Sequence, residues 1–137
     1  MAEARGIQIK QSYDNDGQNW RSVINVVIKT SERERNVAGT LFTGKEPRIV
    51  NIEGVPIEIA LSEHMLFIRN DDKPGLIGGL GTILSDAGQN IADFRLGRKG
   101  AGGSAICVVS LDAPLADDLF EKIANLKQVE SVKRLKF

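Results

Sequence analysis

Asp72 and its neighbours form the stretch of this chain with the most specific chemistry. The segment Arg69-Asn-Asp-Asp-Lys-Pro-Gly75 ends an apolar run and precedes an amphipathic one, and Asn90 follows eighteen positions after Asp72. The Asp72 carboxylate can meet an ammonium group, while free N–H groups at the start of a helix, from Leu76 and Ile77, attract a carboxylate. This junction therefore predicts a site that can capture a small zwitterion.

The same residues also fit a helix start that binds nothing. Pro74 suits the first helical turn, where its missing N–H has no cost, and Asp72 suits the N-cap position before it. Asn90 lies just after Gly88 and tolerates a left-handed turn. For the motif alone, an ordinary capped helix and a ligand site both remain open.

The bulk composition excludes several functional classes. The 137 residues balance 18 basic against 18 acidic side chains, so the surface offers no basic field for nucleic acid or an anionic membrane. The chain has no apolar run of membrane-spanning length and no signal-peptide core, so we expect a cytoplasmic protein. The length fits one domain of ordinary size or two small ones.

Catalytic and metal-binding side chains are few. His64, the only histidine, precedes an apolar run, and Cys107, the only cysteine, lies inside one, which favours a buried inert thiol. The glycines between Gly75 and Gly81 fall in an amphipathic segment and not in a strand-to-helix turn, which argues against a dinucleotide site. We therefore expect no catalytic residue, no metal and no cofactor in this chain.

Residues 63–137 alternate between strand and helix patterns. An apolar strand at 65–68 is followed by a helix of about 13 residues that ends at Gly88, and then by strands at 90–97 and 104–111 joined by a glycine-rich hairpin loop. A second helix opening at Pro114 leads to a last strand at 129–137. The order βαββαβ predicts a ferredoxin-like layout, with four antiparallel strands and both helices on one face.

Two finer patterns help to place side chains in this half. In the strand at 90–97, alternation puts Ala92, Phe94 and Leu96 on one face, and Ile91, Asp93 and Arg95 on the other. In the second helix, Asp117 and Asp118 favour the first turn. Both patterns predict which faces meet the core.

Residues 7–62 differ, because their short β-branched segments contain no helical pattern. We expect strands at 6–10, 22–29, 37–42, 48–52 and 55–60, with a polar turn at 14–17. So small an all-β part buries little and exposes edge strands, so we expect it to need a partner segment. The fold class is therefore α+β, with a helix-poor, β-rich part at 1–62 and a ferredoxin-like domain at 63–137.

The second half resembles an ACT domain, a small amino-acid-binding regulatory module, through Asp72-Lys-Pro-Gly75 and Gly88-Gln-Asn-Ile91. Through residues 36–42 and 47–52, the first half is similar to the intervening (allosteric substrate-binding) domain of long bacterial 3-phosphoglycerate dehydrogenases. The resemblance implies the C-terminal regulatory part of such an enzyme, beginning inside the intervening domain. Catalytic domains and their NAD would lie upstream of Met1, so we expect no dehydrogenase activity from this chain.

The resemblance also implies an effector site and an assembly. In relatives regulated by serine, the effector lies between ACT domains of neighbouring subunits, and the matching positions here are Asn70, Asp72 and Asn90, with helix amides near Leu76 receiving its carboxylate. Position 70 departs from serine-binding versions that have His or Tyr there. A homodimer through pairing of ACT sheets is implied, and a tetramer is allowed in the parent.

A second site and two other functions stay open. Lys45 and Arg48 flank Pro47 and form the best basic pair for a phosphate or substrate-like anion, since some relatives regulate through an anion site in this domain; solvated charges on a turn are the other interpretation. The ACT pair could serve only to hold an oligomer together. Related domains also occur in iron-sulfur L-serine dehydratases, and this chain alone does not decide between the two enzymes.

Overall fold

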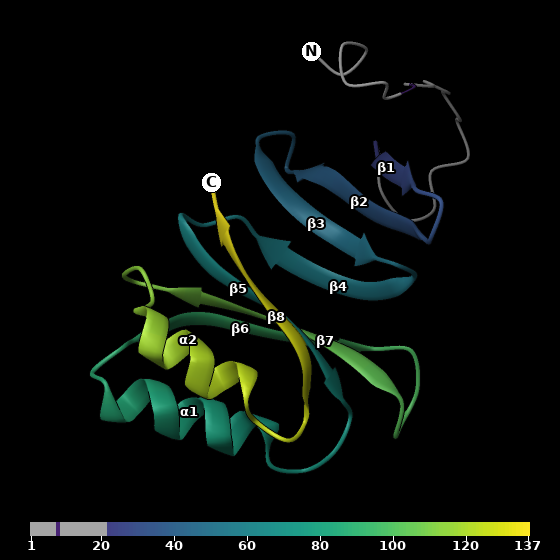
Figure 1. The fold of residues 1–137 in the computed structure, drawn as a ribbon. Helices are drawn as coiled ribbons and strands as arrows, with labels where there is room; N and C mark the ends of the chain where they lie inside the picture. Colours follow the sequence, from purple (N-terminus) through teal and green to yellow (C-terminus); the bar gives the residue numbers. More distant parts are fainter. Residues whose placement is uncertain (1–7, 9–21) are drawn as a thin grey trace.

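The computed structural model describes residue 8 and residues 22–137, which form two four-stranded antiparallel sheets and two helices (Figure 1). The turn predicted at 14–17 lies outside the described residues, as does the strand predicted at 6–10 apart from residue 8. The chain leaves the first sheet at Ala60 and enters the second at His64.

The first sheet is a meander in which each strand pairs with the next along the chain. Its strands are β1 (Ile24–Lys29), β2 (Glu34–Phe42), β3 (Glu46–Ile52) and β4 (Val55–Ala60). This confirms the four predicted strands from residue 22 onward. Strand β2 begins earlier than predicted because a tight turn, in which Thr30 N–H donates to Arg33 O at 2.9 Å, lets Glu34 pair with Lys29.

The second sheet has the strand order β6-β7-β5-β8, and both helices lie on one of its faces (Figure 1). The elements in chain order are β5 (His64–Asp71), α1 (Leu76–Asp86), β6 (Ile91–Arg98), β7 (Ser104–Leu111), α2 (Asp117–Ala124) and β8 (Val129–Lys136). This arrangement confirms the ferredoxin-like βαββαβ layout, and with the first sheet it confirms the α+β class. Strands β6 and β8 form the two edges.

The helix starts differ from the prediction. Helix α1 begins at Leu76 after Gly75, whose φ of 108° is left-handed, and no side chain caps it. Asp72 is therefore not the N-cap and Pro74 is not in the first turn, because the chain turns tightly there, with Lys73 N–H donating to Asp71 O at 2.8 Å. Helix α2 likewise begins after Pro114, at Asp117.

Other predicted helix features are confirmed. Gly88 follows the C-cap of α1 with a φ of 67°, and its N–H donates to Ser85 O at 2.9 Å, as in a Schellman motif. Asp117 and Asp118 occupy the first turn of α2. The buried stripe of α1 is made by Leu76, Leu80 and Leu84.

Strand β6 contains a β-bulge that the alternation pattern did not predict. The register with β7 shifts between Ile91 and Asp93, which face Leu111 and Ser110. The extra residue in a bulge shifts the alternation, so side chains after the bulge point to the sheet face opposite to the one that simple alternation gives. Ile91 and Phe94 consequently both pack against the helix-side core, so the prediction that they lie on opposite faces is wrong.

The face of the second sheet that the helices leave open is covered by the first sheet. Four residues of β3 and β4 share a core with three of β5 and β7: Ile52, Val55, Ile57, Ile59, Met65, Ile106 and Val108. Strand β4 reaches β6 because Gly97 has no side chain; a Cβ there would lie 2.7 Å from Val55 Cγ1 and 3.0 Å from Pro56 O. The two sheets therefore form one packed body, joined through this shared core.

Strand β1 at the far edge of the first sheet has little cover. All six of its residues are exposed, including Ile24 and Ile28 at 73% and 60%. The need for a partner segment stays a prediction. In the described part of the chain, neither helix is long and apolar enough to cross a membrane.

Candidate functional site

Asp72 lies in the turn between β5 and α1 and is already hydrogen-bonded. Its Oδ2 accepts from Arg98 Nη1 at 2.7 Å and from the Gly102 N–H at 3.1 Å, so the end of β6 and the β6–β7 loop hold the carboxylate. The Arg98 hydrogen bond, followed by the Gly102 amide, holds the pKa of Asp72 below its ordinary value of 3.8. Asp72 is therefore a fixed anion at neutral pH, as a partner for an ammonium must be.

Asn70 lies just before this turn, under the helix layer, and is 2% exposed. Its Nδ2 donates to Asp71 O at 2.9 Å, but its Oδ1 is buried and has no hydrogen-bond partner among the described residues. Leaving a buried acceptor unpaired costs about 1–3 kcal/mol. Such a group needs an explanation, and a donor supplied by a ligand is one.

The start of α1 supplies N–H groups beside Asp72. The Leu76 side chain is buried in the helix-side core and the Ile77 side chain is exposed. Because both side chains are apolar, each residue can offer a polar ligand only its backbone N–H. The first N–H groups of a helix have no intrahelical acceptor, and no side chain caps these ones. Carboxylate binding by these N–H groups stays a prediction.

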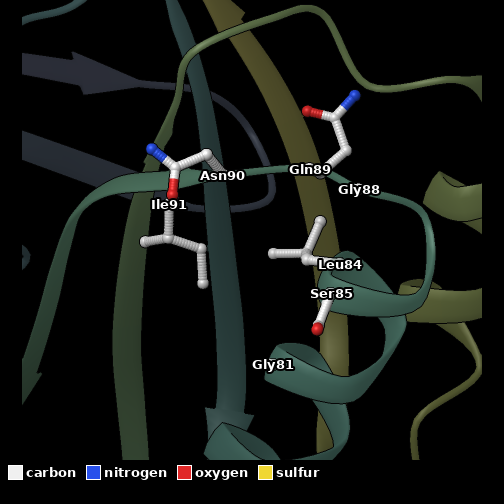
Figure 2. A pocket seen from close by; sticks show the side chains of 7 residues that line it. All are labelled: Gly81, Leu84, Ser85, Gly88, Gln89, Asn90 and Ile91. Atoms are coloured by element: carbon white, nitrogen blue, oxygen red, sulfur yellow. The ribbon is translucent and has the colours of Figure 1, made fainter.

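Asn90 lies in an open recess of about 420 Å³ between the end of α1 and the start of β6 (Figure 2). The recess is lined by Gly81, Leu84, Ser85, Gly88, Gln89, Asn90 and Ile91. Asn90 Nδ2 donates to Asp112 Oδ2 at 2.6 Å. Because a carboxylate only accepts, this bond fixes the amide so that Asn90 Oδ1 is free to accept from a ligand.

One chain does not bring the predicted ligands together. Asp72 is bonded to Arg98 at the end of β6, while Asn90 precedes the first residue of β6. The strand has 8 residues, so the backbones of Asn90 and Arg98 are separated by up to about 26 Å at 3.3 Å per residue. Asn70, Asp72 and the α1 amides therefore belong to one candidate half-site, and Asn90 belongs to another.

The predicted anion pair, Lys45 and Arg48, is placed on the first sheet. Arg48 lies 3.3 Å from Glu46 and 3.5 Å from Glu58, and its guanidinium lies over the Phe42 ring at 5.6 Å. Lys45 is exposed in the β2–β3 turn. The charge of Arg48 is thus shared with two carboxylates, and anion binding at this pair stays a prediction.

The two residues considered for catalysis, His64 and Cys107, both belong to strands of the second sheet. His64 is the first residue of β5, and Cys107 is buried in β7, where burial raises the pKa of its thiol to about 12. A thiol so far from ionisation is not a nucleophile at neutral pH. No cluster of three or more potential metal ligands occurs within residues 22–137.

Sequence reasoning missed the partners of the site residues. Asp112 could not be found by counting back from the hairpin loop, because the pairing of Arg98 with Ala105 places Asn90 opposite Ala113, and only the β-bulge moves it to Asp112. Arg98 carried no signal either, since its pairing with Asp72 depends on how the loop folds over the turn. Both residues now belong to the candidate site.

Comparison with protein families identifies both halves of this chain. Residues 1–53 match the D-3-phosphoglycerate dehydrogenase intervening domain, and residues 64–128 match the ACT domain. The chain is an intervening-domain segment followed by an ACT domain. The candidate half-sites, which contain Asn70, Asp72 and Asn90, all lie within the ACT match.

Curated relatives align with almost all of this chain. It is 32% identical to D-3-phosphoglycerate dehydrogenase of Synechocystis sp., over 96% of this chain and 24% of that protein. The enzymes of that name from Bacillus subtilis and Archaeoglobus fulgidus are 32% and 30% identical over 97% and 92% of the chain, which covers 25% and 24% of them. The chain therefore spans about a quarter of the length of these relatives.

Proposed function

We propose that this chain is the regulatory region of a D-3-phosphoglycerate dehydrogenase, with residues 1–62 as part of the intervening domain and 63–137 as an ACT domain. The ACT domain binds an amino-acid effector, L-serine in the first instance, between two copies of itself. The observation that carries the proposal is the placement of Asp72 and Asn90 at opposite ends of the edge strand β6.

Because Asp72 and Asn90 lie at opposite ends of β6, a second copy related by two-fold symmetry can complete the site. Strand β6 pairs with β7 on one side only, so its other side is open to a second β6. If two copies pair antiparallel along this edge, the start of each β6 lies beside the end of the other. Asn90 of one copy then comes close to the partner's Asp72 and α1 amides.

The ligand chemistry follows from the groups that meet there. Asp72 accepts from the ammonium, and the N–H groups of Leu76 and Ile77 receive the carboxylate. The free Oδ1 atoms of Asn70 and Asn90 accept from the ammonium or from a side-chain hydroxyl. A hydroxyl supplies the donor that Asn70 lacks, which supports serine over an amino acid with an apolar side chain.

The parent enzyme supplies the remainder of the function. Its catalytic domains and NAD lie outside this chain, whose glycines at 75–81 start and line helix α1 and so do not form a phosphate-binding turn. Effector binding across the pair rigidifies the dimer and shifts the catalytic domains toward a less active arrangement, in a cytoplasmic homodimer or tetramer. The names of the relatives support a dehydrogenase over an L-serine dehydratase.

A purely structural role for the ACT pair is the rival function. Two observations favour it, because Asp72 already has a protein cation beside it and Asn70 is almost completely buried. In that case the chains associate but do not bind an amino acid. The two functions differ in one measurable property, which is binding of L-serine to the associated chain.

Complementation between two variants tests both the ligand and the shared site. Asp72→Ala and Asn90→Ala chains should each lose L-serine binding in calorimetry, whereas Asp118→Ala, in the exposed first turn of α2, should bind normally. Mixed and re-equilibrated chains should regain about a quarter of the sites, because half of the dimers are mixed and each has one intact site. Unchanged binding by the single variants, or no recovery on mixing, refutes the shared site.

A further inference from the structure

We propose that Gln128 is a positioning residue of the effector half-site, because it holds the Pro74 carbonyl and so keeps the N–H groups at the start of α1 free for a carboxylate. Gln128 lies in the turn between α2 and β8, just before Val129. The inference rests on the proposed amino-acid effector. It adds a residue from a distant part of the chain, since Gln128 follows Pro74 by 54 positions.

Gln128 contacts both ends of the β5–α1 turn. Its backbone O accepts from the Asp71 N–H at 2.9 Å, and its side-chain Nε2 donates to Pro74 O at 2.9 Å. Asp71 is the last residue of β5, and Pro74 lies just before Gly75, the N-cap of α1. The α2–β8 turn therefore holds the β5–α1 turn both where it leaves the strand and where it approaches the helix (Figure 1).

The bond to Pro74 O affects where α1 begins. In an α-helix each N–H donates to the carbonyl four residues earlier, so Gly78 N–H is the donor that would extend α1 back to Pro74 O. Within the described part of the chain Gly78 N–H makes no such bond, and the first helical bond runs from Gly79 N–H to Gly75 O at 2.9 Å. Gln128 Nε2 takes the place of Gly78 N–H at Pro74 O. The carbonyl is therefore directed to the α2–β8 turn instead of to the helix.

Three N–H groups at the start of α1 stay free as a result. They belong to Leu76, Ile77 and Gly78, whose helical acceptors would lie before Gly75. No side chain caps them in the described residues. A carboxylate has two acceptor oxygens, and free N–H groups at the positive end of a helix favour it. Release of Pro74 O would let Gly78 N–H bond within the helix, which removes one of the three donors from the ligand.

Gly75 gives Gln128 access to Pro74 O. A Cβ atom at position 75 would lie 2.7 Å from Gln128 Nε2, so a larger residue displaces the amide from its bond. The φ of 108° at Gly75 also disfavours any residue with a side chain. The glycine of the Asp72-Lys-Pro-Gly75 motif therefore serves both the backbone turn and the Gln128 contact.

Backbone amide exchange of the 137-residue chain tests the state of Pro74 O without any ligand. Gln128→Met keeps the length of the side chain and the backbone bond to Asp71, but it has no donor for Pro74 O. We expect the Gly78 amide to exchange about threefold to tenfold more slowly in this variant, because Gly78 N–H gains a helical hydrogen bond. Unchanged exchange at Gly78, followed by NMR, overturns the proposal.

Two ligands that differ only at the carboxylate test the link to the effector. Gln128→Met should bind L-serine about tenfold more weakly in calorimetry, because a charge-assisted contact with the α1 N–H groups is lost. L-serinamide keeps the ammonium and the hydroxyl but has a neutral amide, which gains less from these N–H groups. Its affinity should fall at most about twofold. Equal losses for the two ligands would mean that Gln128 only supports the fold, and they overturn the proposal.

Asn125→Ala is the matched control, since Asn125 Nδ2 also donates to a backbone carbonyl at a helix end, Glu121 O at 2.7 Å. It should lower the midpoint of urea unfolding but leave L-serine affinity and Gly78 exchange unchanged. An equal loss of L-serine affinity in this control would assign the Gln128 effect to general destabilisation, against the proposal. A wild-type chain that binds no L-serine refutes the proposed function and this inference together. Normal wild-type binding with no effect of Gln128→Met refutes this inference alone.

Discussion

Asp72 and Arg98 form an ion pair that joins the β5–α1 turn to the end of β6, with Arg98 Nη1 2.7 Å from Asp72 Oδ2. The pair places a protein cation on the carboxylate that we assign to the effector ammonium. Two positive groups beside one carboxylate repel each other, so we expect Arg98 to limit how strongly Asp72 holds the effector ammonium.

Removing Arg98 should therefore tighten effector binding. In Arg98→Ala the Asp72 carboxylate keeps its Gly102 hydrogen bond but loses the competing cation. Because the pair is partly exposed, we expect the affinity for L-serine to rise about two- to fivefold in calorimetry. Arg95→Ala, which breaks a 2.9 Å pair with Asp93 on the same strand, is the matched control and should change little. Weaker binding by Arg98→Ala would instead show that Arg98 orients Asp72 for the ligand.

Two glycine substitutions should have opposite effects on stability. In Gly97→Ala the new methyl group meets Val55 and the Pro56 backbone, so we expect a loss of about 1–3 kcal/mol as β4 is forced away from β6. In Gly78→Ala the methyl group enters open space on α1, where alanine favours the helix by about 0.5–1 kcal/mol. Urea unfolding measures both. A neutral Gly97→Ala would mean that the two sheets do not need this close approach.

The sequence predicted the elements better than their ends. The spacing of apolar residues in α1 and the alternation in the strands reflect which side chains pack against the core. These two patterns were sufficient to predict the βαββαβ order. The start of α1 could not be predicted, because Asp72 bonds to Arg98, 26 positions along the chain, instead of capping the helix. The bulge in β6 was missed for a similar reason, since it depends on the register with β7.

The candidate site was predicted as a set of residue types but not as an arrangement. Asp72 and Asn90 stand out by motif, yet nothing local shows that they lie at opposite ends of an edge strand. The cover that β4 gives to the second sheet was also unpredictable, because it depends on Gly97 allowing two strands of different sheets to approach. Because the first sheet covers this face of the second sheet, a second copy can pair only with the edges of the second sheet.

Stability in acid should depend on Glu53. Burial alone would raise its pKa, but the hydrogen bonds and charges of Arg35 and Arg69 outweigh this and hold the pKa below its ordinary value of 4.5. A lowered folded-state pKa adds stability at neutral pH that is lost as the pH falls below 4.5 and through the folded-state value. Glu53→Gln should therefore cost about 1 kcal/mol at neutral pH and flatten this part of the pH dependence.

The measurement for Glu53 is urea unfolding from pH about 7 down to about 3. Asp72, whose pKa is also lowered, by Arg98 and then Gly102, stays in both proteins, so the difference between the curves isolates Glu53. Glu58→Gln removes a more exposed carboxylate 3.5 Å from Arg48 and should cost less at neutral pH. Parallel curves for wild type and Glu53→Gln would contradict the role of Glu53.

Asp112 should control the second half-site through the orientation of Asn90. Its carboxylate accepts from Asn90 Nδ2 at 2.6 Å, which leaves Asn90 Oδ1 as the acceptor that we assign to the effector. In Asp112→Asn the new amide can present either its NH₂ or its oxygen, so the Asn90 amide is no longer held in one orientation. We expect the affinity for L-serine to fall about threefold to tenfold, measured by calorimetry, because one ligand contact becomes uncertain. Asp118→Asn on α2 should bind as wild type, and an Asp112→Asn chain of unchanged affinity would show that Asn90 is oriented by the ligand and not by Asp112.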